Sequence, residues 1–263
     1  MNLGLKGKRA VVTGGSRGIG RACAVALAKE GTRVCIVARN RKPLDVVVRE
    51  INDAGGEGYA VAVDLRHLEG CKQVVNEVRK IFGGVDILVN NVGAARNSDV
   101  LSLDVDQISE ALQLKSYSYL RMAQLVIPDM KENGWGRIVN NIAGGAGTSP
   151  TRGNIPTGAA NITILNMTRA LSDAVAGDGI LVNTVCPGLT NTPRSRTQQR
   201  GRAEREGRDV EEVLKELGAE LPAGRMAEPE DIANTVTFLA SEACSYIFGS
   251  SIYMDGGGRR STP

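Results

Sequence analysis

The stretch TGGSRGIG at residues 13–20 decides the fold of this chain. It follows a short apolar run, Arg9–Val12, which is typical of a buried strand. It leads into Arg21–Glu30, a segment rich in helix formers that is followed by the helix-ending Gly31. A glycine loop therefore joins a strand to the N-terminus of a helix.

Three glycines of this loop have expected roles. Gly14 allows the tight turn, Gly18 lets the backbone approach a ligand, and Gly20 lets the helix lie against the strand. The free amides and positive dipole end of the helix favour a pyrophosphate. The glycine spacing differs from the common dinucleotide fingerprint, so a structural turn is the alternative, but the strand–loop–helix context favours nucleotide binding.

The composition is that of an ordinary globular protein. The 263 residues are 42% apolar and 23% charged, enough for one sizeable core or two small ones. The net charge of +3 is too small to indicate nucleic acid or membrane partners, and no apolar run approaches the roughly 20 residues of a membrane span. Because residues 1–8 lack an apolar signal core, we expect a cytoplasmic protein.

The cysteines are scattered, odd in number and surrounded by apolar residues. We expect them to be small buried hydrophobes in a reducing compartment, and neither disulfides nor a metal site. They are Cys23, Cys35, Cys71, Cys186 and Cys244.

Strand and helix signals alternate along almost the whole chain. The strands are near-continuous Val, Ile and Leu runs, which indicates a parallel sheet covered by helices on both faces. This predicts an α/β fold with a doubly wound sheet and ligands at the carboxyl ends of the strands. With no linker or repeat, residues 1–263 are expected to form one domain. The further expected strands are Arg33–Ala38, Tyr59–Val63, Asp86–Val89, Arg137–Asn140, Ile180–Val185 and Ser251–Met254. The further expected helices are Pro43–Ala54, Leu68–Phe82, Val105–Met130, Asn161–Ala176, Val210–Leu217 and Pro229–Ala240.

Two arginines indicate which cofactor the loop binds. Arg39 follows the second strand, where an acidic residue would bind the ribose 2′-hydroxyl of NAD(H). No acid is present there, and the guanidinium groups of Arg39 and Arg17 are suited to a 2′-phosphate. The pattern favours NADP(H) over NAD(H), and the alternative is a pair of solvated arginines.

Other strand ends carry polar motifs. Asp64-Leu65 ends the third strand and is expected near the adenine. Asn90–Gly93 ends the fourth, where an amide can fasten neighbouring strands and a glycine leaves room for the cofactor. After the sixth strand, a proline bend is expected to aim Thr190 and Thr192 at the nicotinamide.

With these motifs, the chain resembles the short-chain dehydrogenase/reductase family from end to end. The resemblance implies one Rossmann-type domain, a nicotinamide cofactor and a homotetramer or homodimer. The motifs are TGGSRGIG (13–20), DL (64–65), NNVG (90–93), GRIVN (136–140), PGLTNT (187–192), GRMAEPEDIA (224–233) and YMDGG (253–257). The cofactor contacts implied by the resemblance are Gly14, Ser16, Arg17, Gly18, Ile19, Gly20, Arg39, Asp64, Leu65, Asn91, Gly93, Thr190 and Thr192.

Four positions depart from the family's catalytic pattern. The usual chemistry needs a Tyr acid, a Lys that lowers its pKa, a Ser on the substrate oxygen and an Asn that anchors a relay water. The corresponding positions here are Thr157, Asn161, Ala143 or Gly144, and Lys115. No tyrosine lies between residues 119 and 246. Because an aliphatic hydroxyl is a far poorer acid than a phenol, Thr157 cannot simply replace an activated Tyr.

Lys115 has two interpretations. In the cleft, desolvation would lower its pKa and make it a general acid or an electrostatic clamp; otherwise it is a solvated helix lysine. Tyr117 and Tyr119 point to different helix faces, so at most one of them joins a site. The loop candidates are Thr148, Ser149 and Asn154, and the only histidine, His67, is expected to be a bystander.

The segment at about 192–221 lies where the family usually has its substrate lid. One interpretation of its basic first part is a mobile, solvated loop. The other is recognition of an anionic substrate, such as a carboxylate or the phosphates of a coenzyme A thioester. The basic residues are Arg194, Arg196, Arg200, Arg202, Arg205 and Arg208.

The favoured hypothesis is an NADP(H)-dependent oxidoreductase that moves a hydride to or from a carbonyl or secondary alcohol of a small, anionic substrate. Lys115, Thr157 and Asn161 would line the reacting end, with water as a proton source. Two alternatives are a non-catalytic nucleotide-binding relative, acting as a scaffold or sensor, and a non-redox lyase or isomerase that uses Lys115.

Overall fold

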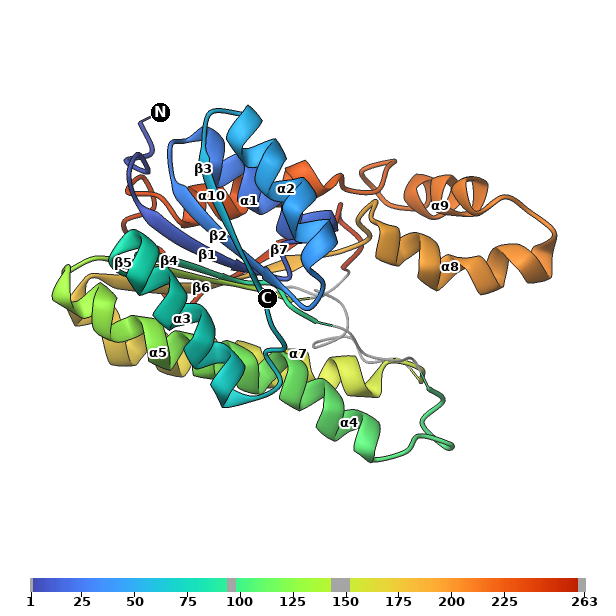
Figure 1. Ribbon diagram of the computed structural model, residues 1–263. Helices are drawn as coiled ribbons and strands as arrows, with labels where there is room; N and C mark the ends of the chain where they lie inside the picture. Colours follow the sequence, from blue (N-terminus) through green and yellow to red (C-terminus); the bar gives the residue numbers. More distant parts are fainter. Residues whose placement is uncertain (1, 94–97, 143–151, 260–263) are drawn as a thin grey trace.

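Seven parallel strands form one sheet at the centre of the molecule (Figure 1). The computed structural model describes residues 2–93, 98–142 and 152–259. The strands are β1 (Arg9–Thr13), β2 (Arg33–Ala38), β3 (Glu57–Ala62), β4 (Ile87–Asn90), β5 (Gly136–Asn141), β6 (Ile180–Pro187) and β7 (Ser251–Met254). Their order is β3-β2-β1-β4-β5-β6-β7. The strand order reverses between β1 and β4, where ligands bind in doubly wound sheets. The predicted α/β fold is confirmed.

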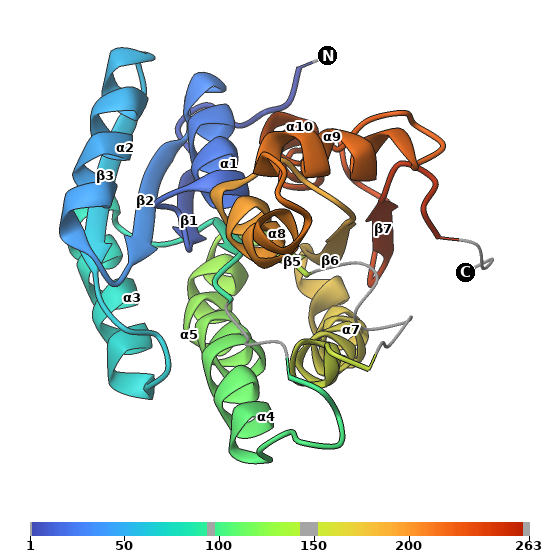
Figure 2. The same ribbon diagram turned by 90° about the vertical axis from the view of Figure 1, so that its right-hand side faces the viewer.

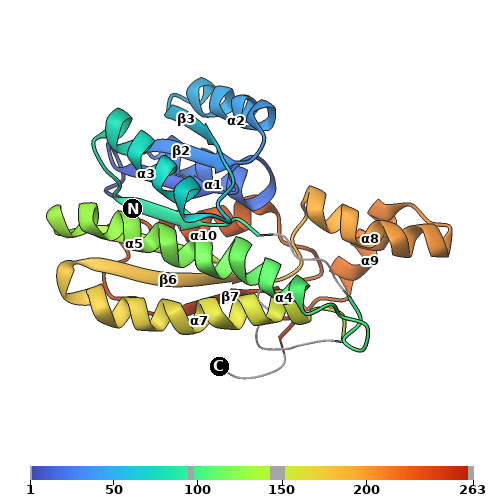
Figure 3. The ribbon, with the colours of Figure 1, turned by 60° about the horizontal axis from the view of Figure 1, so that its bottom comes forward.

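Helices cover both faces of this sheet (Figures 1 and 3). One layer is α1 (Gly18–Lys29), α2 (Arg41–Asp53) and α10 (Pro229–Leu239). The other layer contains α3 (Leu68–Phe82), α5 (Ser118–Glu132) and α7 (Ile155–Val175). Neighbouring residues of one strand serve opposite layers: Val12 packs with the first and Val11 with the second. The sheet is therefore buried on both faces, as the apolar runs predicted.

The long helical region before β5 consists of three consecutive segments rather than one uniform helix. It begins as α4 (Asp106–Ala111), widens into the π-helical segment η1 (Leu112–Tyr117) and continues as α5. A π-helical turn holds an extra residue, and such turns often occur at functional sites. Lys115 lies in η1.

The helix expected at Asn161–Ala176 begins earlier in the structure. Helix α7 begins at Ile155, so Thr157 and Asn161 both lie inside it. Pro156 fits the first turn, where its missing N–H costs no hydrogen bond. The poor helix formers around it, Thr157 and Gly158, hid the helical signal in the sequence.

The interpretation of residues 192–206 as a solvated loop is wrong. They form α8 (Pro193–Glu206), which with α9 (Val210–Ala219) makes a helical hairpin beyond the carboxyl ends of the strands (Figures 1 and 2). Thr192 and Ser195 form a reciprocal capping box at its start. The cap and the ion pairs to α9 stabilise this segment as a helix, although its many charges are also typical of a solvated loop.

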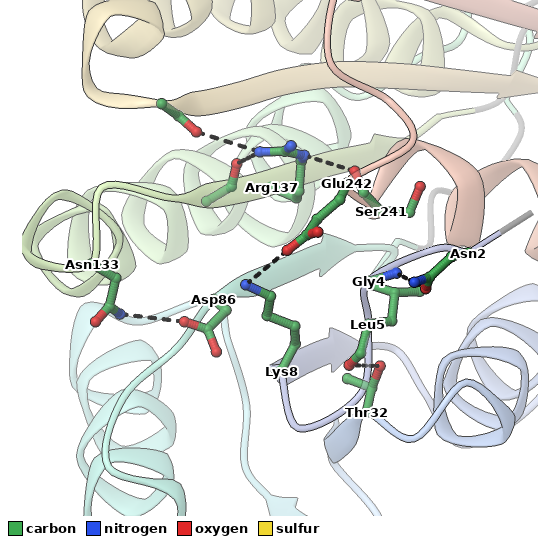
Figure 4. A network of polar contacts seen from close by, with 12 residues as sticks. Asn2, Gly4, Leu5, Lys8, Thr32, Asp86, Asn133, Arg137, Ser241 and Glu242 are labelled. Atoms are coloured by element: carbon green, nitrogen blue, oxygen red, sulfur yellow. Dashed lines mark hydrogen bonds and ion pairs between the residues drawn. The ribbon is translucent and has the colours of Figure 1, made fainter.

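The opposite end of the sheet is closed by a polar network (Figure 4). Asp86 accepts two hydrogen bonds from the Arg9 guanidinium, at 2.7 and 2.8 Å, and one from Asn133 at 3.3 Å. Arg137 donates to the carbonyl of Ser241 at 3.2 Å, and Lys8 pairs with Glu242 at 3.6 Å. These contacts join the N-terminal segment and the turn after α10 to the amino ends of the strands, away from the glycine loop.

All five cysteines are free and buried, as expected of small hydrophobes. Across residues 2–93, 98–142 and 152–259, no helix combines the length and apolar character needed to cross a membrane. The same part of the chain contains no cluster of His, Cys, Asp and Glu suited to a metal ion.

Candidate active site

The glycine loop has the backbone geometry expected of a phosphate cradle. Gly14 and Gly18 have φ of +64° and +55°, which a residue with a Cβ rarely adopts. A Cβ on Gly20 would collide with the Gly14 carbonyl and the Asn91 amide. The roles predicted for Gly14 and Gly20 therefore follow directly from their surroundings.

Asn91 fixes this loop to the neighbouring strands. Its side-chain amide donates to the carbonyls of Thr13 and Gly14, at 3.2 and 3.1 Å. Its oxygen accepts a hydrogen bond of 2.6 Å from the side chain of Asn141, at the end of β5. The prediction that an amide fastens the strands here is confirmed.

A cavity of about 470 Å³ opens beside the loop at the carboxyl ends of β1, β2 and β4. It lies at the N-terminus of α1, where free backbone amides and the helix dipole favour a phosphate. Most of the predicted cofactor contacts line it: Gly14, Ser16, Arg17, Gly18, Ile19, Arg39, Asp64, Leu65, Asn91, Gly93 and Thr192. Of the other two, Thr190 lines the neighbouring cavity and Gly20 lies beneath the loop.

Arg17 and Arg39 are exposed side chains on the wall of this cavity. Within the described part of the chain, neither forms an ion pair with a carboxylate. Asp64, by contrast, is held by Arg66, with 3.0 Å between Oδ2 and Nε, and this hydrogen bond lowers the pKa of Asp64. The positive charge of Arg39 contributes further to that lower pKa.

A second cavity, of about 380 Å³, continues from the first toward β6 and α7. Its walls include Lys115, Asn154, Thr157 and Thr190. The two cavities share the following residues: Ile19, Asn91, Gly93, Thr192 and Arg194. The two cavities are therefore direct neighbours.

Lys115 and Asn161 meet beside this second cavity. The Lys115 ammonium donates to the Asn161 side-chain oxygen, with 2.5 Å between Nζ and Oδ1. Asn161 is fully buried, and the Lys115 stem passes close to Gly93, where a Cβ would lie 3.3 Å from Cδ. Desolvation, followed by the positive charge of Arg194, lowers the pKa of Lys115 to about 7. Lys115 therefore lies at the cleft and is not a solvated helix lysine, while its role as a general acid or an electrostatic clamp stays a prediction.

Thr157 lies four residues before Asn161 on α7, one helical turn away, and faces the same cavity. The structure thus gathers the three predicted residues Lys115, Thr157 and Asn161. The loop residues Ala143, Gly144, Thr148 and Ser149 lie outside the described residues.

Neither of the two tyrosines on the long helical region lines the two cavities. Tyr119 is buried, and its hydroxyl lies 3.0 Å from the Val92 carbonyl and 2.9 Å from the Asn141 carbonyl. Burial raises the pKa of Tyr119 well above its ordinary value. Tyr117 is 40% exposed, and His67 is exposed on the N-terminal side of α3. Tyr119 is therefore a structural anchor beneath the loop after β4.

Four of the six arginines of this segment fall into two groups. Arg196, Arg202 and Arg208 form ion pairs with glutamates, mainly those of α9, and so hold α8 to α9. Arg194 instead lines both cavities and donates to the Gly93 carbonyl at 2.9 Å. In the sequence, Arg194 is one of a run of similar arginines. It differs from the others by its position at the start of α8, and the sequence did not predict where that helix begins.

Together, the fold and the joined cavities define a dinucleotide-binding α/β protein with a polar reaction pocket. A family model described as enoyl-(acyl carrier protein) reductase matches residues 14–258. The chain belongs to the short-chain dehydrogenase/reductase family, and it is an oxidoreductase of the class that acts on CH–OH or carbonyl groups.

Its relatives have several substrates. The chain is 31% identical over 255 residues to the 3-oxoacyl-[acyl-carrier-protein] reductase of Vibrio cholerae, covering 97% of this chain and 98% of that one. It is 32% identical over 250 residues to the 7alpha-hydroxysteroid dehydrogenase of Bacteroides fragilis, covering 94% and 92%. The structure of L-sorbose reductase from Gluconobacter frateurii, complexed with NADPH and L-sorbose, is similar over 100% of both chains, with 33% identity and a TM-score of 0.95.

Proposed function

We propose that this protein is an NADP(H)-dependent oxidoreductase that transfers a hydride between the cofactor and a carbonyl or secondary alcohol of a small, anionic substrate. The observation that carries the proposal is the pair of joined cavities. One has a glycine cradle and two arginines without carboxylate partners in the described ranges, and the other holds Lys115, Thr157 and Arg194. When bound, the nicotinamide would supply or accept the hydride.

The residues of the first cavity fit NADP(H). The glycine loop offers backbone amides to a pyrophosphate, and Arg17 and Arg39 offer two cations beyond the end of β2. No acidic residue follows β2 to bind a 2′-hydroxyl, since Ala38 is followed by Arg39 and Asn40. L-sorbose reductase and an actinorhodin polyketide ketoreductase, both solved with NADPH, support this choice.

The residues of the second cavity suggest a non-standard active site for an anionic substrate. Lys115, Thr157 and Asn161 would hold the reacting end, and Arg194 would contact a carboxylate or phosphate. Arg194 is suited to this because no ion pair occupies it among the described residues, whereas the ion-paired arginines of α8 stabilise the hairpin. We also propose a cytoplasmic homotetramer or homodimer, a single domain over residues 1–263, and a lid at about 192–221.

A second candidate is a non-catalytic family member that senses nucleotide. The observation in its favour is that the described residues bring no tyrosine hydroxyl into the second cavity. Such a protein would bind NADPH with a folded glycine loop but would transfer no hydride.

The test is to measure NADPH and NADH binding by calorimetry, then hydride transfer by absorbance at 340 nm with a panel of keto acids, acyl thioesters and neutral ketones. The proposal expects tighter binding of NADPH than NADH and turnover that favours the anionic members. Binding without turnover would support the sensor instead. Product formation without a change in absorbance would support a lyase or isomerase.

A further inference from the structure

Lys115 and Asn161 occupy two positions whose usual residue types are exchanged in this chain. By the family resemblance, the long helical region carries the Asn and α7 carries the Lys. Here η1 carries the lysine and α7 carries the amide, and the two side chains touch at 2.5 Å. The site therefore still has an ammonium group here, but η1 supplies it instead of α7.

We propose that Lys115 is the proton donor to the substrate oxygen during reduction, and the base in oxidation, with Asn161 holding its ammonium in place. The inference rests on the oxidoreductase function proposed above. As a hydride adds to the carbonyl carbon, the π electrons of C=O move onto the oxygen. One N–H bond of Lys115 then breaks, and its proton forms the new O–H bond. The two electrons come from the reduced nicotinamide, and the neutral amine regains a proton from water.

The geometry around Lys115 suits this role. Its stem lies against Gly93, which lines both cavities, and Lys115 itself lines the second, the proposed substrate cavity. Asn161 is neutral and fully buried, so it can fix the position of the ammonium without locking the charge as a carboxylate would. The π-helical turn that contains Lys115 is the kind of local distortion often found where a side chain has a functional role.

The electrostatic surroundings favour proton transfer near neutral pH. Among the residues that the structure describes, the ionisable groups that face Lys115 are Arg194 from α8 and Cys186 from β6, whereas α7 contributes neutral side chains. Desolvation is the larger effect and Arg194 the second, and together they lower the pKa of Lys115 to about 7. A donor whose pKa is near the working pH is most effective, because it is protonated often enough and releases its proton readily.

The other groups at this site are poorer donors. Burial raises the pKa of Cys186 to about 12. The Tyr119 hydroxyl is directed at two backbone carbonyls, and the Thr157 hydroxyl is aliphatic. Among the described residues that line the cavity, Lys115 is the group that both reaches it and titrates near neutral pH.

The experiment compares the wild type with Lys115→Met and Lys115→Arg, using Lys72→Met on the surface of α3 as a matched control. The first readout, without turnover, is the pH dependence of Lys115 acetylation by acetic anhydride, quantified by peptide mass spectrometry in the presence of NADP⁺. We expect half-maximal reactivity near pH 7, well below that of the surface lysines in the same digest. The second readout is single-turnover hydride transfer, with NADPH binding measured alongside to show that each variant is folded.

We expect Lys115→Met to slow hydride transfer by about 10²–10⁴-fold with NADPH affinity kept within about threefold. Lys115→Arg keeps the charge but cannot titrate, so its rate should be low and independent of pH. If the wild type turns over and Lys115→Met keeps its rate and pH profile, or if Lys115 reacts like a surface lysine, the inference is overturned while the proposed function stands. If the wild type transfers no hydride to any member of the panel, both fail.

Discussion

The glycine-loop cavity and the Lys115 cavity lie side by side and share Asn91, Gly93 and Arg194, yet they are built differently. The first depends on backbone: left-handed glycines and the start of α1. The second depends on side chains from three elements, η1, α7 and α8. Few sequences form a phosphate-binding backbone loop, whereas a charged side chain at a given point can come from either of two facing helices. The first cavity therefore depends on where glycines stand in the chain, and the second on which helices bring their side chains together.

The largest expected effect tests the backbone cavity. Gly20→Ala adds a Cβ that collides with the Gly14 carbonyl and the Asn91 amide, so the cradle must open. We expect NADPH affinity to fall by about 100-fold, or ~3 kcal/mol. Gly177→Ala is the control, because a Cβ there meets nothing within 4 Å. Calorimetry that finds equal affinities for the two variants would remove the backbone argument.

The next effect concerns stability and the titration of Lys115. The pKa of Lys115 is lowered to about 7 in the folded protein, so between pH 7 and 9 the unfolded chain holds more protons than the folded one at this position. Stability should therefore rise with pH over that range by about 2 kcal/mol more in the wild type than in Lys115→Met. Urea unfolding at pH 7, 8 and 9 measures this difference. Parallel curves for the two proteins would mean that Lys115 titrates normally.

A smaller effect concerns the choice of cofactor. Arg39→Met removes a cation from the wall of the first cavity, so NADPH should bind about 10-fold more weakly while NADH binding stays unchanged. Arg49→Met, an exposed arginine on α2 outside the cavity, is the matched control. An equal loss for both cofactors in Arg39→Met would show that the arginine does not recognise the 2′-phosphate.

The smallest effect links the hairpin to the reaction pocket. The positive charge of Arg194 helps to lower the pKa of Lys115, so Arg194→Met should raise that pKa by less than about one unit. The pH at which the rate of hydride transfer declines should then be higher. Arg200→Met, which changes an exposed residue on the same helix, should leave that pH unchanged. A decline at lower pH in Arg194→Met would contradict the proposed effect of the Arg194 charge on the pKa of Lys115.

The fold could be read from the sequence because its signals are strong and local. The predicted bounds of β2, β7 and α3 agree with the structure, since apolar runs and the glycine after Phe82 mark them clearly. The start of α7 and the whole of α8 were missed. The start of α7 has a proline in its first turn, and α8 is stabilised by a capping box and by ion pairs to α9. An interpretation based on composition treats proline and a high density of charge as signs of a loop.

For the candidate site too, the sequence located individual residues but not the contacts that depend on helix packing. Arg17 was chosen as a residue of the glycine loop and Arg39 as the residue after the second strand, and both line the first cavity, because strand ends in a parallel sheet meet at one edge. Counting along the helices also located Lys115 and Asn161. Their direct contact, and the entry of Arg194 from α8, could not be predicted, since both depend on how separate helices pack and on the π-helical turn of η1.

The central claim is that the side chain opposite Asn161 supplies the proton, and the variant Asn161→Asp tests it most directly. A carboxylate in place of the amide oxygen, 2.5 Å from Nζ, would stabilise the ammonium and raise the pKa of Lys115 by about one to three units. The measurement is the pH dependence of single-turnover ketone reduction by the wild type and this variant. The rate should decline as the pH rises through about 7 in the wild type, and the decline should shift upward by about one to three pH units in Asn161→Asp. Superimposable profiles, with both proteins folded and binding NADPH, would contradict the claim.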